Sequence, residues 1–123
     1  MLAMIGMRNW NRSRTIDTWV IKMTIAVTRN KALRAFRHIN RQVFENTLEV
    51  PKFEIDYLDT ETGYCVDGTI GISEVFDSRQ DFLNTLCHEM AHLCQEQVLD
   101  TEPDHGVTFR AISKHAKRFG YQL

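Results

Sequence analysis

The stretch from Ser78 to Leu99 constrains the fold of this 123-residue chain more than any other part of the sequence. Ser78 followed by Asp81 is typical of a helix start, because a serine hydroxyl can cap the backbone amide three residues later. On a helical projection the apolar residues lie on one side, and His88 and His92 lie about 40° apart on a different side. We therefore predict a helix that lies between the protein core and a cleft.

We predict one further helix before this central helix and one after it. Asn30 is suited to cap a helix over 30–46, and the apolar spacing after Gly106 predicts a last helix over about 106–119. Alternating apolar residues over 19–27 predict either a strand or the lead-in to the first helix. These elements divide the chain into an N-terminal extension, residues 1–29, and one domain, residues 30–123.

The segment over about 52–76 predicts strands. Pro51 ends helical structure, and apolar residues then alternate with polar ones up to Phe76. Asp67-Gly68 is a strong signal for a two-residue hairpin turn, so we predict an antiparallel three-stranded meander. Gly71 marks either a bulge or a place where another backbone approaches closely. The order helix, strands, helix, helix predicts an α+β domain.

Composition excludes several classes of protein. With 43% apolar and 25% charged residues, the chain is typical of a folded globular protein, and no apolar run approaches the roughly 18 residues of a membrane-spanning helix. The three cysteines, Cys65, Cys87 and Cys94, form no Cys-x-x-Cys pair and favour a reducing compartment, with Cys87 and Cys94 as buried free thiols. Apolar residues precede the first arginines, the reverse of a secretory signal. We expect a protein of the cytoplasm, nucleoid or nucleus that is not secreted.

Charge is strongly segregated along the chain. Residues 1–41 carry nine Lys or Arg and one acid, residues 42–104 carry two and fifteen, and residues 105–123 carry four and none. One interpretation is that basic and acidic segments pair with each other; the other is a basic face that contacts nucleic acid. The candidate nucleic-acid contacts are Arg34, Arg37 and Arg41 on the first helix and Lys114 and Lys117 on the last.

The string His88-Glu89-Met90-Ala91-His92 predicts a zinc site that carries out hydrolysis. Histidines four residues apart on a helix project from the same face, so both can bind one metal ion. Zinc accepts neutral imidazole nitrogens, and it lowers the pKa of a bound water to about 7. Glu89, next to the first histidine, can hold that water and take its proton. We expect one Zn²⁺ per chain.

A catalytic zinc site needs a third protein ligand. The candidates downstream are Glu96, Glu102, Asp104, His105 and His115. His105 is favoured because the turn Asp104-His105-Gly106 can bring the chain back to the site. His38 lies among arginines, where a surface or phosphate-facing position is expected.

Two strings together resemble the SprT-like family of zinc metalloproteases, the family of the Spartan protease domain. They are LNTLCHEMAHLCQEQ and, after twelve residues, His105-Gly106-Val107-Thr108-Phe109. The segments 40–48 and 68–73 resemble the family's first helix with its exit and the strand before its metal helix. The likeness covers about residues 30–121. It implies a small zincin-like domain, here a minimal member that has no cysteine-based zinc ribbon after the protease domain.

The resemblance implies a role for several residues. His88, His92 and His105 would be the zinc ligands and Glu89 the catalytic acid/base. The strand that pairs with an extended substrate would comprise Thr69, Ile70, Gly71, Ile72 and Ser73. The group that stabilises the oxyanion is not assigned by the motif, and Tyr64 and Tyr121 are candidates.

We therefore expect a zinc metalloprotease that hydrolyses peptide bonds with a metal-activated water. If it follows Spartan, its substrates are DNA-bound or DNA-crosslinked proteins, so its partners would be a protein or peptide substrate and DNA, without a membrane. The alternative is a zinc-containing module that binds DNA or protein without cutting it. In a third interpretation the histidines are surface residues and no metal binds.

Overall fold

A computed structural model describes residues 24–57 and 62–123 of the chain. The elements in chain order are β1 (Ile25–Ala26), α2 (Arg29–Val43), β2 (Lys52–Asp56), β3 (Gly63–Val66), β4 (Thr69–Ser73), β5 (Val75–Phe76), α3 (Arg79–Gln97) and α4 (Val107–Lys117). This is an α+β fold, which confirms the predicted class. Most of the predicted strand over 19–27, and most of the predicted extension 1–29, lie outside the described residues.

Helix α2 begins two residues earlier than predicted. Its cap is Thr28, whose hydroxyl oxygen accepts a hydrogen bond from the Lys31 amide at 3.2 Å, so Asn30 lies inside the first turn. The buried face includes Phe36, Ile39 and Val43, at spacings of three and four. This helix is amphipathic, as the sequence pattern predicted.

The three-stranded sheet has the order β2-β4-β3, so the predicted antiparallel meander is wrong. β3 and β4 form an antiparallel hairpin through Asp67 and Gly68, whose φ angles are 48° and 76°, and this part is confirmed. β2 instead pairs in parallel with β4, from Lys52 opposite Thr69 to Asp56 opposite Ser73. Alternation in the sequence sets which face each side chain takes, but it does not set which strands are neighbours.

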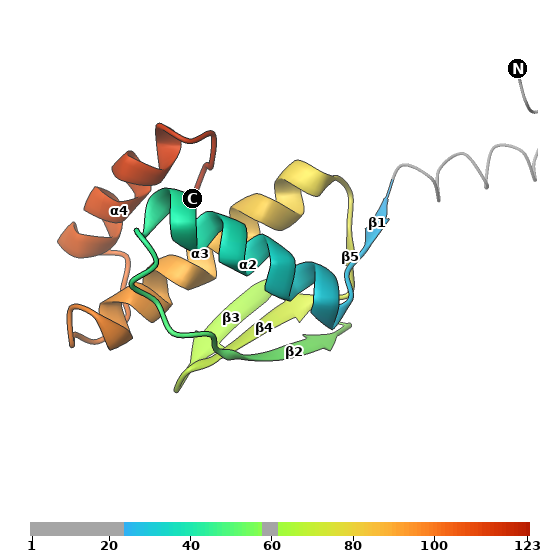
Figure 1. The fold of residues 1–123 in the computed structure, drawn as a ribbon, viewed down its shortest axis with the longest axis horizontal. Coiled ribbons are helices and arrows are strands. Elements are labelled where there is room, and N and C mark those ends of the chain that lie inside the picture. The colour runs from blue at the N-terminus through green and yellow to red at the C-terminus, as the bar shows by residue number, and fades with distance from the viewer. Residues whose placement is uncertain (1–23, 58–61) are drawn as a thin grey trace, which may run out of the picture.

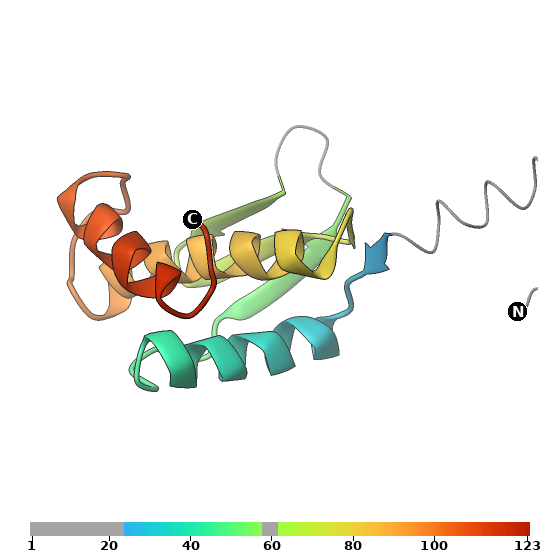
Figure 2. The ribbon, with the colours of Figure 1, turned by 90° about the horizontal axis from the view of Figure 1, so that it is seen from above.

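The helices cover one face of this sheet. α2 and α3 pack beside each other over the strands, and α4 lies against the second half of α3 (Figures 1 and 2). The core between these layers includes Phe36 of α2, Ile70 and Ile72 of β4, and Leu86 and Met90 of α3, all fully buried. No helix in the described part of the chain is long and apolar enough to cross a membrane.

The start of α3 and the end of α4 follow the predictions. The Ser78 hydroxyl accepts a hydrogen bond from the Asp81 amide at 3.0 Å, and α3 ends at Gln97, two residues earlier than expected. Gly120 follows α4 with a φ of 94°, a conformation that favours glycine after a helix.

The described residues contain a single ion pair, between Lys52 and Glu54 at 3.8 Å. The interpretation that the basic and acidic segments pair with each other is therefore wrong for residues 24–57 and 62–123. The basic side chains of α2 and α4 lie on exposed surface instead.

Candidate metal centre

Three histidines converge at one point of the molecule. His88 and His92 project from consecutive turns of α3, and His105 comes from the loop before α4. The Nε2 atom of His105 lies 3.2 Å from the Nε2 atoms of both His88 and His92. Four-coordinate zinc with bonds of 2.0–2.1 Å to nitrogen separates its ligand atoms by about 3.3 Å. The donor set and its spacing therefore fit a metal ion.

The buried side chain of Gln95 fixes the orientation of His92. The Asp104 amide donates to Gln95 Oε1 at 3.2 Å, and Gln95 Nε2 donates to the Asp104 carboxylate, also at 3.2 Å. Because an amide N–H can only donate and a carboxylate can only accept, Oε1 must be the acceptor for His92 Nδ1, 2.9 Å away. His92 therefore carries its proton on Nδ1 and turns a bare Nε2 toward the centre.

Gln95 also holds the loop that delivers His105. Besides the bonds to Asp104, Gln95 Nε2 donates to the Thr108 hydroxyl at 2.8 Å. The backbone carbonyl of Gln95 accepts from the Thr101 amide at 2.9 Å. The sequence motif predicts no role for Gln95. The available signal was its position, seven residues after His88 and on the same face of α3.

The ring of Phe109 packs against all three histidines. Its centroid lies 4.8 Å from those of His88 and His105 and 4.9 Å from that of His92, on which it stacks with an interplanar angle of 24°. Phe109 is buried, and its partners are the histidines rather than the apolar core. These contacts restrict the rotamers of the histidines.

The environment of the cluster favours a neutral imidazole at His88. Burial, and to a smaller extent the rings of His92 and His105, lower the pKa of His88 to about 4. At neutral pH this ring is therefore uncharged and its lone pair is available to a metal ion.

Glu89 lies next to this cluster, beside strand β3. It is 7% exposed and lines a cavity of about 290 Å³ together with His88, Gly63 and Asn84. A Cβ atom on Gly63 would lie 3.2 Å from Glu89 Cγ and 3.0 Å from Thr85 Cγ2. Glycine at this position therefore allows α3 to approach the strand closely. Apart from Glu89, the described residues that line this cavity carry no charged side chain, and we call it the neutral cavity.

A second and larger cavity opens on the other side of His88. It has a volume of about 580 Å³ and combines His88, His105 and Phe109 with three cations of α4, which are Arg110, Lys114 and Lys117. We call it the basic cavity. The cluster thus lies between two cavities of different charge.

A family model of the SprT-like family matches residues 32–123. The chain belongs to the SprT-like family. No individually curated protein matches the sequence. Membership indicates a metalloprotease-type domain that depends on a metal, and the histidine cluster supplies the side chains to hold one.

The other candidate ligands of this SprT-like domain lie outside the cluster. Glu96 accepts a hydrogen bond from the Cys65 thiol, Asp104 accepts from the Gly106 amide, and the exposed Glu102 does not join the histidines. His115 is half-buried and hydrogen-bonds the Val43 carbonyl at 3.0 Å, which ties α4 to the end of α2. His38 is exposed on α2, as expected.

The prediction that Thr69–Ser73 forms a free edge for substrate is wrong. This strand, β4, is central: it pairs with β2 on one side and with β3 on the other. Gly71 does accommodate a close neighbour, but the neighbour is the Tyr64 ring, 2.1 Å from where a Cβ would stand. Ile70 and Ile72 face the core, where they are fully buried.

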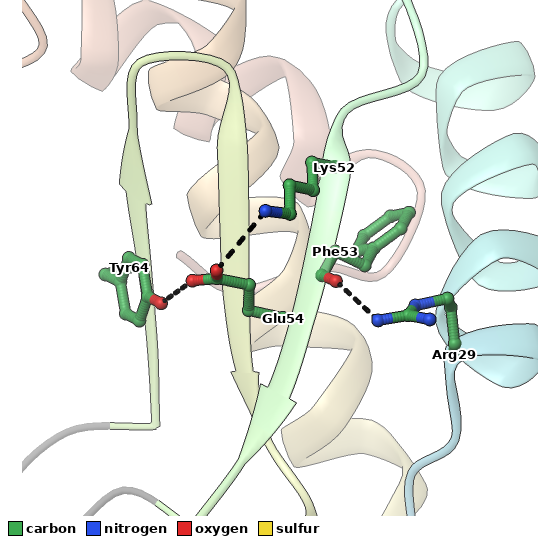
Figure 3. A network of polar contacts seen from close by, with 5 residues as sticks. All are labelled: Arg29, Lys52, Phe53, Glu54 and Tyr64. Atoms are coloured by element: carbon green, nitrogen blue, oxygen red, sulfur yellow. Dashed lines mark hydrogen bonds and ion pairs between the residues drawn. The ribbon is translucent and has the colours of Figure 1, made fainter.

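Neither tyrosine proposed for the oxyanion faces the cluster. The Tyr64 hydroxyl donates to Glu54 across the sheet, on the face away from the helices, as Figure 3 shows together with the Lys52–Glu54 ion pair. The buried Tyr121 donates to Gln42 Oε1 at 2.7 Å. Both candidates are therefore wrong, because their hydroxyls are engaged elsewhere.

The cysteines take no part in the centre. Cys87 and Cys94 are buried free thiols, as predicted, and Cys65 is half-buried. Burial raises the pKa of Cys87 to about 12, and burial together with the charges of Glu96 and Glu89 raises the pKa of Cys65 to about 12. Protonated thiols are poor ligands and poor nucleophiles at neutral pH.

Proposed function

We propose that this chain is a zinc-dependent peptidase that uses His88, His92 and His105 as metal ligands and Glu89 as the acid/base. The observation that carries the proposal is the convergence of three histidines, with His105 Nε2 3.2 Å from both other Nε2 atoms, beside a cavity that contains Glu89. Three imidazoles are a ligand set that suits zinc and leaves a fourth position for water. Zinc supplies Lewis-acid chemistry that makes water a nucleophile near neutral pH.

The side chains around the cluster divide the remaining work. Glu89 orients the attacking water, takes its proton as the new C–O bond forms, and gives that proton to the amine as the C–N bond breaks. Gln95 keeps Nε2 of His92 directed at the centre through the hydrogen bond to Nδ1. Phe109 packs against all three rings and restricts their rotamers.

The substrate strand adds to β3 in this proposal. Among the described residues β3 pairs with β4 alone, so β3 is an edge strand of the sheet that they form. Gly63, at the start of β3, lines the neutral cavity together with His88 and Glu89. An extended peptide that pairs with this edge would bring one of its carbonyl groups to the metal centre.

The decisive experiment compares Glu89→Gln with Glu96→Gln in the zinc-loaded protein. Glu96 lies on the same helix, seven residues later, and outside the histidine cluster. We expect one zinc per chain in both variants, cleavage of an unfolded protein substrate by Glu96→Gln, and loss of at least about 10²-fold in rate for Glu89→Gln. Retained cleavage by Glu89→Gln would overturn the mechanism.

The same assay separates the peptidase from a binding module. A module would bind zinc yet leave every protein substrate intact, both with and without single-stranded DNA. Zinc-loaded wild-type protein that cleaves no substrate under either condition would favour the module.

We also propose that substrates are held on DNA, with charge as the only support. Arg34, Arg37 and Arg41 are exposed on α2, and none of them has a carboxylate within 4 Å in the part of the chain that the structure describes. Replacing all three by Gln should weaken single-stranded DNA binding and reduce its salt dependence, measured by fluorescence anisotropy. Equal affinity of the variant and the wild type for single-stranded DNA would exclude this face of α2 as the DNA-binding site.

A further inference from the structure

We propose that the basic cavity is a specificity subsite for acidic peptide segments on one side of the cleaved bond. This inference rests on the proposed peptidase function, because a subsite is defined relative to the cleaved bond. Binding of a peptide to the basic cavity can nevertheless be measured without cleavage. The charged side chains that line it besides the histidines are Arg110, Lys114 and Lys117, all cationic.

The three cations share one face of α4. They stand at positions i, i+4 and i+7, so they align along the helix over about 10.5 Å. That length corresponds to about three residues of an extended peptide. Arg110 is held at the mouth of the centre, because its guanidinium donates to the His105 carbonyl at 3.4 Å.

These cations have no acidic partner among the described residues. The one ion pair in residues 24–57 and 62–123 is Lys52–Glu54, so no carboxylate of that part lies within 4 Å of Arg110, Lys114 or Lys117. Leu123 also lines the cavity, and its side chain is apolar. A ligand with negative side chains would supply the missing partners at little desolvation cost, since all three cations are exposed.

The neutral cavity favours a peptide over a nucleic acid as this ligand. A chain that crosses the cluster passes from the basic cavity into the neutral cavity, because His88 lines both. The described residues that line the neutral cavity supply no cation, and the carboxylate of Glu89 disfavours the evenly spaced negative charges of a polyanion. A peptide can carry acidic residues on one side of a bond and neutral residues on the other.

The test uses short peptides with one common centre and either Glu or Asn residues on one flank. The peptides carry fluorescein and are titrated with the zinc-loaded Glu89→Gln variant. Fluorescence anisotropy then gives the Kd of each peptide. We expect the Glu flank to bind about tenfold more tightly than the Asn flank at low salt, on one side of the centre only. Added salt should reduce the difference.

Charge reversal provides the specific control. Lys114→Glu, Lys117→Glu and the double variant should lose the preference for Glu and gain one for Lys. Arg118→Glu is the matched control, because it makes the same charge change on the next residue of the chain, outside the basic cavity. It should keep the preference for Glu. Zinc content and the thermal unfolding midpoint are measured for every variant.

The outcomes separate this inference from the peptidase proposal. Equal Kd for Glu and Asn flanks, or the same change in Lys114→Glu and Arg118→Glu, would overturn the subsite even if the wild type cleaves peptides. A single-stranded oligonucleotide that binds through Lys114 and Lys117 when the Glu peptide does not would also overturn it. Selective binding of the Glu peptide by a protein that cleaves no substrate would support the subsite and refute the peptidase.

Discussion

Two buried side-chain amides hold the loops that follow α2 and α3, and they do so in similar ways. Asn40 donates to the Leu48 carbonyl at 3.0 Å and accepts from the Leu48 amide at 3.2 Å. Gln95 similarly donates to the Asp104 carboxylate and accepts from the Asp104 amide, nine residues after it. Each amide lies near the end of its helix and replaces the hydrogen bonds that the turning backbone cannot make with itself.

The difference between the two amides lies in what else they contact. Gln95 is also hydrogen-bonded to His92, and the loop that it holds carries His105. Among the described residues, the side-chain hydrogen bonds of Asn40 go to Leu48 alone, in a loop that leads to β2. The same structural device therefore serves only stability at the end of α2, and both stability and metal-site geometry at the end of α3. Variants at both ends can test this comparison.

The largest effect is expected for the ligand that the Gln95 loop carries. His105→Ala removes one of three nitrogen donors, and we expect zinc affinity to fall by at least about 100-fold, measured by competition with a chromophoric chelator. His115→Ala is the control of the same residue type. It should keep the affinity, because His115 hydrogen-bonds the Val43 carbonyl. Equal losses in both variants would contradict the assignment of the third ligand.

A smaller loss is expected for Gln95→Leu. Without the amide, the Nδ1 proton of His92 has no acceptor and the His105 loop loses its hydrogen bonds to α3. Loss of such a partner behind a ligand costs about 10- to 100-fold in metal affinity. If Gln95→Leu bound zinc as tightly as the wild type, Gln95 would not support the metal site and would not differ from Asn40 in function.

Asn40→Leu should affect stability without affecting the metal site. The Leu48 amide and carbonyl would be left buried without partners, which costs about 1–3 kcal/mol in free energy of unfolding, measured by urea denaturation. Zinc affinity of the folded variant should equal that of the wild type. A loss of zinc affinity similar to that of Gln95→Leu would mean that the two ends are coupled.

The smallest effect is expected for the pH dependence of stability, which arises from His88 on α3 and not from Asn40 on α2. In the metal-free protein the pKa of His88 is about 4, below its ordinary value of 6.5, so the unfolded chain binds more protons between these values. This contribution to stability is present above pH 6.5 and is lost as pH falls toward 4. His88→Gln should reduce the pH dependence of the free energy of unfolding, measured by urea denaturation of the metal-free protein. Asn40→Leu should leave this pH dependence unchanged.

The sequence predicted those parts of the site that depend on local geometry. His88 and His92 are four residues apart on a helix, so their shared face follows from 3.6 residues per turn. The Ser78 cap and the Asp67-Gly68 hairpin are likewise short-range features, and both are confirmed. The choice of His105 from five candidates rested on a turn signal, and the structure brings that residue to the cluster.

The errors fall where pairing partners are far apart in the chain. The strand at residues 69–73 was expected at an edge and is central, because β2 lies beside it in parallel rather than beside β3. Tyr64 was considered for the oxyanion, yet it lies on the outer face of the sheet over Gly71. Periodicity would look the same for both strand orders, so it could not decide between them.

The sequence by itself determined the class of the domain, the metal-binding helix and the identity of its first two histidines, because helix periodicity and capping act within one or two turns. Only the tertiary structure decided that β3 is the edge beside Glu89, that Gln95 connects His92 to the His105 loop, and that three cations of α4 face the same cluster. These features depend on how the layers pack, and packing energy is shared among residues that the sequence separates.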